Sequence, residues 1–314
     1  MGIIGRHSFE LCSRPRIISS ASYVGDKEGK GPLRECFDKI CRDDTLGLDS
    51  WEQAESRMFE SAVRVALAKI KRQSDDLSCL LGGDLLNQII SSGFAAREIR
   101  APFIGLYGAC STISEGLMLG GMLVDGGFAE LAACAASSHF SAAERQFRYP
   151  LEMGVQAVPS SQRTVTGAGS IIIQAAGEFR PGAGNVFEHV ALTGGTIGSV
   201  EDFGITDANN MGAAMAPAAF KTIKTHLSDY SRRVEDYDRI ITGDLGIFGS
   251  DMLYELLRGE GIEIADRHED CGKLMFSPEQ NVNCGASGCG CAATVMSSWF
   301  LPKIEGEVST SVSG

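Results

Sequence analysis

The chain has 314 residues, of which 44% are hydrophobic and 22% charged, and it carries a formal net charge of −12. This composition is typical of a globular protein, and the length is enough for one large domain or two fused ones. The acidic balance argues against nucleic-acid binding as the main function, because no face can collect many uncompensated cations.

No targeting or membrane-spanning segment is expected. The chain has no run of about 18 apolar residues, which a transmembrane helix requires, and residues 1–7 lack the pattern of a secretory signal. The ten cysteines are therefore expected to be reduced thiols in the cytoplasm rather than a disulfide framework.

Periodicity predicts the elements of the first half. Residues 8–24 alternate loosely and are expected to form one or two strands. A helix is predicted over 51–72, with Met58, Ala62, Val65 and Leu67-Ala68 on its buried face. Further strands are predicted at 77–81, 103–107, 131–137 and 169–174, a helix at 111–124, and a Gly-rich linker at 177–185.

The second half repeats landmarks of the first. A helix is predicted over 214–229, and the following strand ends in Gly243-Asp244-Leu245, as the earlier one ends in Gly83-Asp84-Leu85. The turns 108–111 and 285–288 each precede a helix, and both helices are expected to end in an acidic residue followed by glycine, at 125–126 and 305–306. The pattern predicts an internally duplicated α/β protein with halves 1–177 and 178–314, the second lacking two strands.

Cys110 is the most informative single residue. A short apolar run ends in Gly108-Ala109, and a helical period begins directly after the cysteine. The backbone N–H groups and the dipole at a helix N-terminus favour a thiolate, so this position can present a nucleophile.

Several stretches resemble the stage V sporulation protein AD family, a group of thiolase-like proteins from endospore formers. The most specific is the non-repetitive string Ser-Ser-His-Phe-Ser-Ala-Ala-Glu-Arg-Gln-Phe-Arg-Tyr-Pro at 137–150. The others lie at 83–88, 108–112, 164–169, 202–207, 211–219, 242–245, 270–272 and 285–289. The resemblance extends from about residue 8 to about residue 307.

The resemblance implies a thiolase-like five-layer αβαβα fold and a homodimer. It also implies binding of dipicolinic acid (pyridine-2,6-dicarboxylate) or its calcium chelate, and a role in its uptake into the developing spore. The protein would then be cytoplasmic, peripheral to the inner spore membrane, and a partner of other stage V channel proteins. Family members continue into two more strands after the last helix, so the second half of this chain is expected to lack them.

Catalysis by Cys110 would need a base and oxyanion donors, which thiolase-fold enzymes supply from the second half. At the matching places this chain has Asp244 and the turn that contains Ser287. An anionic Asp244 would raise the pKa of the thiol, and His139 and His268 are the remaining candidates for a base.

The preferred hypothesis is therefore a non-catalytic pocket that binds ligand. The alternatives are an acyltransferase or thiolase-type condensing enzyme that uses Cys110, and a scaffold whose pocket is vestigial.

The candidate ligand-binding residues suit a flat dicarboxylate. Arginine forks pair with carboxylates and aromatic rings stack on a pyridine ring, which points to Arg145, Arg148 and Tyr149. The alternative is that the arginines pair with Glu144 and Glu152 to hold a loop or dimer contact. The other members of the expected set are Cys110, Asp84, His139, Asp244 and Ser287.

Neither a resident metal nor a cofactor is expected. His268, Cys271, Cys284, Cys289 and Cys291 are zinc-ligand types, but their spacing is looser than in structural zinc sites. Asp84, Asp207 and Asp244 are expected to cap turns, with pocket lining near a ligand-bound Ca²⁺ as the alternative.

Overall fold

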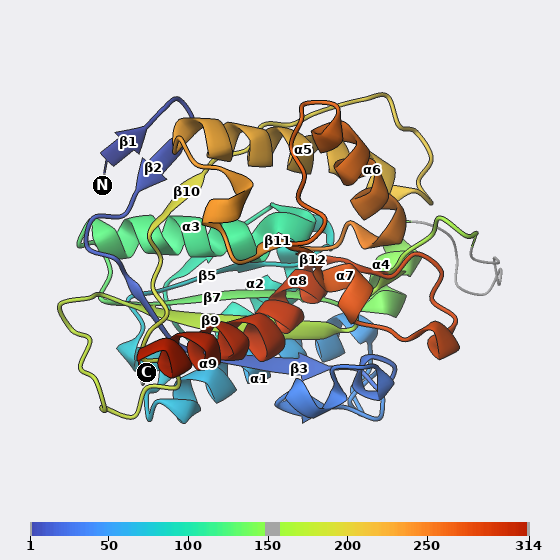
Figure 1. Cartoon of the computed structure of the whole chain (residues 1–314). Coiled ribbons are helices and arrows are strands. Elements are labelled where there is room, and N and C mark those ends of the chain that lie inside the picture. The colour runs from blue at the N-terminus through green and yellow to red at the C-terminus, as the bar shows by residue number, and fades with distance from the viewer. Residues whose placement is uncertain (1, 148–157, 313–314) are drawn as a thin grey trace.

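The centre of the molecule is a mixed sheet of six strands (Figure 1). The structure is a computed structural model that describes residues 2–147 and 158–312. In spatial order the strands are β4 (Lys39–Ile40), β3 (Arg16–Val24), β9 (Gly167–Gln174), β7 (Leu131–Ser138), β5 (Cys79–Gly83) and β6 (Phe103–Gly105). β5 is parallel to β6 and β7, and β9 is antiparallel to β7 and β3. The carboxyl ends of β3, β5, β6 and β7 therefore share one edge of the sheet, where ligand sites of open α/β sheets lie.

Helices cover both faces of this sheet. They are α1 (Trp51–Lys69) and α2 (Ile90–Ile99) on one face, and α3 (Thr112–Asp125) and α8 (Cys289–Val295) on the other. In β7, Ala133 belongs to the apolar cluster on the α1 side and Cys134 to the cluster on the α3 side. Because both faces are buried, the strand is apolar throughout instead of alternating with polar residues.

The second half adds a smaller sheet and an outer helical layer. β11 (Ile240–Thr242) pairs in parallel with β12 (His268–Asp270). Ile240 packs in the cluster formed by α5 (Met211–Asp229) and α6 (Gly246–Arg258), whereas Ile241 packs in the cluster beneath, around α8. The two strands thus lie between the outer helices α5 and α6 and the central helix α8. The molecule therefore has five layers, which are α1 with α2, the six-stranded sheet, α3 with α8, the smaller sheet, and α5 with α6.

The remaining elements connect the layers. They are β1 (Gly2–Ile4), β2 (Ser8–Glu10), β8 (Arg163–Thr164), β10 (Gly194–Thr196), β13 (Ala286–Ser287), α4 (Phe140–Phe147), α7 (Cys271–Leu274), α9 (Leu301–Val312) and the π-helical η9 (Met296–Phe300) between α8 and α9. β2 pairs with β1 and β10, and β8 pairs with β13. No helix within the described ranges is long and apolar enough to cross a membrane.

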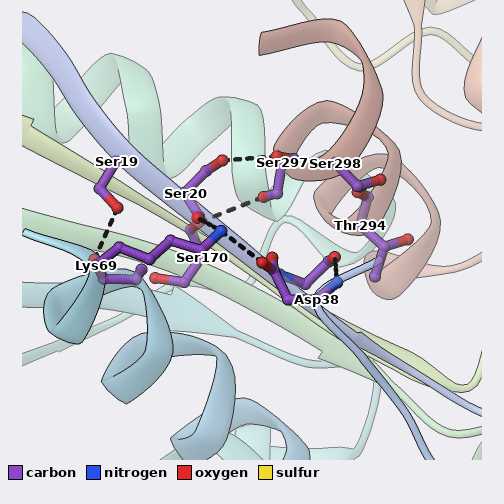
Figure 2. Close-up of polar contacts among 10 residues, drawn as sticks. Ser19, Ser20, Asp38, Lys69, Ser170, Thr294, Ser297 and Ser298 are labelled. Carbon is purple, nitrogen blue, oxygen red and sulfur yellow. Dashed lines mark hydrogen bonds and ion pairs between the residues drawn. The ribbon is translucent and has the colours of Figure 1, made fainter. Parts of the chain in front are cut away.

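A buried polar seam joins the π-helix to the sheet (Figure 2). Ser20 of β3 donates to the carbonyl of Ser297 at 2.6 Å, and the Ser297 hydroxyl donates to the carbonyl of Ser170 at 3.3 Å. Ser19 donates to the carbonyl of Ala66 in α1 at 2.7 Å. The hydroxyls of Ser19, Ser20 and Ser297 are thus satisfied by backbone carbonyls, whereas the buried Ser170 hydroxyl has no hydrogen-bond partner among the described residues.

Most predicted elements of the first half are confirmed within a few residues. Two details of the predicted helices, one in each half of the chain, are wrong. Ala68 faces solvent, because the buried face of α1 passes through Ala66 and Leu67 instead. Glu305-Gly306 lies inside α9, which continues to Val312. The proposed division at residue 177 stays a prediction.

Candidate active site and ligand pocket

Cys110 lies where the sequence predicted a strand-to-helix turn. It belongs to η5 (Ala109–Ser111), between β6 and α3. Ala109 has φ of +47°, a left-handed conformation that residues with a Cβ seldom adopt. Strained turns of this kind present a side chain at the carboxyl edge of a sheet.

Among the charged groups, Asp244 has the largest effect on the pKa of Cys110. Its carboxyl group lies close enough to the thiol for the two groups to shift each other's pKa values. Burial, followed by the charge of Asp244, holds the pKa of the Cys110 thiol well above its ordinary value. Burial also raises the pKa of Asp244 to about 6, although the Cys110 thiol and the Gly288 N–H lower it. Burial and the neighbouring Asp244 therefore keep the Cys110 sulfur protonated, and the predicted direction of the pKa shift is confirmed.

The two turns that repeat in the sequence meet at this point. The Gly288 N–H donates to Asp244 Oδ2 at 2.9 Å, and the thiol of Cys289 donates to the carbonyl of Ala109 at 2.8 Å. Gly288 has φ of +97°, and a Cβ there would lie 3.0 Å from Ser138 Oγ. The start of α8 is thus tied to the Cys110 turn by backbone and side-chain contacts.

The Asp84 carboxylate accepts hydrogen bonds from the turn that follows it and from the first residues of α2. It is buried and accepts from the Leu86 N–H at 2.8 Å, the Ser92 N–H at 2.7 Å and the Ser92 hydroxyl at 2.6 Å. Burial raises its pKa. These contacts match the expectation that Asp84 caps a turn.

A second buried acid, Glu55 of α1, lies next to Asp84 and was not anticipated. The Ser137 hydroxyl donates to Glu55 Oε1 at 3.0 Å. Burial and the neighbouring Asp84 hold the pKa of Glu55 well above its ordinary value. Its position three residues before Met58, on the predicted buried face of the helix, was the available signal.

His139 and Arg145 converge on one aromatic ring. The His139 ring stacks on Trp51 with centroids 6.5 Å apart, and the Arg145 guanidinium lies 5.1 Å from the Trp51 centroid. Arg145 pairs with Glu52, and not with Glu144. His139 Nε2 hydrogen-bonds the Asp44 carbonyl at 2.8 Å, and burial lowers the pKa of the imidazole. Arg148 and Tyr149 lie outside the described residues.

His268 is engaged within the second half. Its Nε2 bonds Thr242 Oγ1 at 2.8 Å, and its Nδ1 bonds the Tyr254 hydroxyl at 2.8 Å. Burial, aided by Lys273, lowers the pKa of the imidazole to about 4. Both ring nitrogens are thus occupied away from Cys110. Ser287 lies buried in β13, next to the Gly288 turn.

Within the described residues, the acidic and cysteine-rich segments do not form a metal-binding cluster. In the described part of the chain, no three His, Cys, Asp or Glu side chains are placed to hold an ion together. Cys289 and Cys291 donate to backbone carbonyls, of Ala109 and Gly243. Asp207 accepts from the Asn209 N–H at 2.9 Å in an exposed turn.

The fold defined by these layers is that of thiolase-like enzymes. The structure is similar to cerulenin-bound OleA of Xanthomonas campestris, with a TM-score of 0.58 and 14% identity, covering 94% of this chain and 88% of that one. It is also similar to 3-oxoacyl-(acyl carrier protein) synthase III, FabH, of Pseudomonas aeruginosa PAO1, with a TM-score of 0.53 and 13% identity, covering 95% and 90%.

Sequence comparison identifies the family within that class. Residues 5–312 match the model of the stage V sporulation protein AD family. The chain is also 42% identical over 311 residues to Stage V sporulation protein AD of Bacillus subtilis (strain 168), covering 98% of this chain and 89% of that protein. The chain belongs to the stage V sporulation protein AD family.

The Asp244 contact makes a prediction about thiol reactivity. In an Asp244→Asn variant, we expect iodoacetamide to alkylate Cys110 faster at pH 8, about tenfold for each unit by which the thiol pKa falls. The difference should vanish below pH 6, where the native carboxyl is itself protonated. Mass spectrometry of the Cys110 peptide measures the rate, and Asp207→Asn is the control. Equal rates in both variants would contradict the electrostatic role of Asp244.

Proposed function

We propose that this chain is a non-catalytic protein of spore formation that binds dipicolinic acid or its calcium chelate. It supports uptake of that ligand into the developing spore as part of a membrane channel complex. The observation that carries the non-catalytic part is the position of Asp244, which accepts from the Gly288 N–H at 2.9 Å beside the Cys110 turn and raises the pKa of the thiol. A carboxyl group that disfavours the thiolate stands where an enzyme would need a base.

Membership of the sporulation family supports the process, and the chemistry of the described residues supports the ligand. Dipicolinate is a flat dianion with an aromatic ring. Arg145 offers a guanidinium above the Trp51 ring, with His139 stacked on the same ring. Glu52, the partner of Arg145, lines a cavity of about 560 Å³ between α1 and α2, together with Arg97. A ligand carboxylate that enters from this cavity would replace Glu52 on Arg145.

Titration calorimetry with dipicolinate, alone and with equimolar Ca²⁺, tests this proposal. We expect Arg145→Met to weaken binding about tenfold or more, because a charge-assisted hydrogen bond is lost. Arg258→Met is the matched control, since Arg258 is also half-exposed and pairs with a glutamate, Glu263, at 3.0 Å, and neither residue lines this cavity. If the native chain binds neither form of the ligand, the proposal is wrong and the scaffold function remains.

We also propose a homodimer, formed through the edge of the large sheet. β6 pairs only with β5 among the described strands, and Ile104 in it is 41% exposed. Tyr107, just beyond it, is 68% exposed. An unpaired, apolar strand edge is a template for pairing with another copy. Light scattering should give twice the chain mass, and Ile104→Lys should give the monomer; a monomeric native chain would refute the dimer.

A further inference from the structure

The cavity of about 560 Å³ lies between two helices that run in the same direction. The Ser91 hydroxyl at the start of α2 donates to the carbonyl of Glu52 at the start of α1 at 3.3 Å. Near the end of α2, the carbonyl of Glu98 accepts from Arg64 Nη2 of α1 at 2.8 Å. The contacts advance along both helices together, so the cavity follows the helix axes.

Charged side chains stand at both ends of this cavity. At the end near Ser91 is Glu52, which pairs with Arg145. At the other end Arg97 pairs with its neighbour Glu98 at 2.7 Å and lowers the pKa of that carboxyl group. Apart from Arg57 and Glu60, the remaining lining residues are uncharged, and they are Leu48, Ser50, Gln53, Ser56, Ile90, Ser91 and Phe94. The two ends thus each offer a guanidinium that a glutamate holds.

The Arg97 side chain is directed back along α2. Its guanidinium lies over the Phe94 ring, 5.1 Å from the centroid, and Phe94 lines the cavity. Long side chains on helices point toward the helix N-terminus in this way. Phe94 is three residues beyond Ser91, which corresponds to about 4.5 Å along the helix axis. The Arg97 guanidinium is therefore about one helical turn from the level of Ser91, the residue that contacts Glu52.

The present partner of Arg97 holds it weakly. Both Arg97 and Glu98 are exposed, and exposed ion pairs contribute little to stability. A carboxylate that is bound inside the cavity would form a stronger, bidentate contact with the guanidinium. Arg57 differs, because its partner Glu60 also binds Arg64, and the three residues form a row along α1 that stabilises the helix.

We propose that Arg97 receives the second carboxylate of the ligand and so selects a dicarboxylate over a monocarboxylate. One carboxylate would replace Glu52 on Arg145, and the other would replace Glu98 on Arg97. The ring between them would lie against Ile90 and Phe94, which line the cavity. This inference rests on the proposed function, since it assigns a further contact to the same ligand.

Titration calorimetry with two probes tests the role of Arg97. Dipicolinate has two carboxylates, and picolinate (pyridine-2-carboxylate) has one. We expect the native chain to bind dipicolinate about tenfold or more tighter than picolinate, whose weaker binding is measured by competition. Arg97→Met should lower the affinity for dipicolinate about tenfold and leave the affinity for picolinate unchanged. Arg145→Met should weaken the binding of both probes.

Two further variants serve as controls. Arg100→Met should keep the preference for dipicolinate, because Arg100 also lowers the pKa of Glu98 but does not line the cavity. Arg97→Lys should keep part of the preference, because the charge remains and the planar fork is lost. Arg97→Met itself should fold like the native chain, since methionine and arginine favour a helix about equally.

The outcomes separate this inference from the proposed function. Equal affinity of the native chain for the two probes would overturn the role of Arg97 and leave the proposed function standing. An Arg97→Met variant that changes both affinities by the same factor, or neither, would do the same. A native chain that does not bind dipicolinate would overturn the proposed function and this inference together.

Discussion

Gly169→Ala is expected to destabilise the protein by about 3 kcal/mol or more. Gly169 lies in β9, where the strand crosses α8. A Cβ there would be 2.2 Å from the carbonyl oxygen of Ala293 and 2.3 Å from its carbonyl carbon. Both atoms belong to helix backbone, so no side-chain rotation relieves the clash, and α8 must move as a unit.

The same shift would disturb the candidate site, because α8 begins at Cys289 beside the Cys110 turn. Thermal unfolding followed by circular dichroism measures the loss. Gly93→Ala is the control, since a Cβ at this position in α2 meets nothing within 4 Å. That variant should be about 0.5–1 kcal/mol more stable, because alanine favours the helix. A Gly169→Ala protein as stable as the native one would contradict the close contact.

The second large effect is a pH dependence centred on Glu28, in η1 (Glu28–Lys30). Its side chain is buried, and its Oε1 accepts from the Thr166 N–H at 3.1 Å. Burial raises its pKa from 4.5 to about 7, although the Thr166 bond and Arg163 lower it. Above pH 4.5 the unfolded chain gives up this proton while the folded chain keeps it. Stability is therefore lost as pH rises from 4.5 to 7, and the loss is complete above pH 7.

Glu28→Gln should remove this loss while keeping the acceptor for Thr166. At pH 8 we expect the variant to be more stable than the native protein by about 3 kcal/mol at most. This free energy corresponds to the difference between the ordinary pKa of 4.5 and the folded-state pKa of about 7. At pH 4 the two proteins should be equally stable. Urea unfolding at both pH values measures the difference, with the exposed Glu35→Gln as control. Parallel pH curves for native and Glu28→Gln proteins would rule out the buried titration.

The Cys110 turn and its opposing carboxyl could be predicted from the sequence. The Gly108-Ala109 turn before Cys110, the helical period after it and the similar turn at Gly285–Gly288 are local signals. The resemblance to thiolase-fold proteins implied that Asp244 would lie near the thiol. The contacts of His139 and Arg145 with the Trp51 ring could not be predicted from local signals. These residues come from segments about 90 positions apart along the chain, and only the packing of α4 against α1 brings them together.

The sequence by itself determined the order of elements, the thiolase-like class and the position of Cys110, because period, turn residues and family motifs are local properties. Tertiary structure alone decided the environment of the charged groups. Glu28 and Glu55 are ordinary acidic residues in the sequence, yet each is fully enclosed by elements distant along the chain. Desolvation depends on what surrounds a side chain in space, so the raised pKa values could not be derived from the sequence before the layers were assembled.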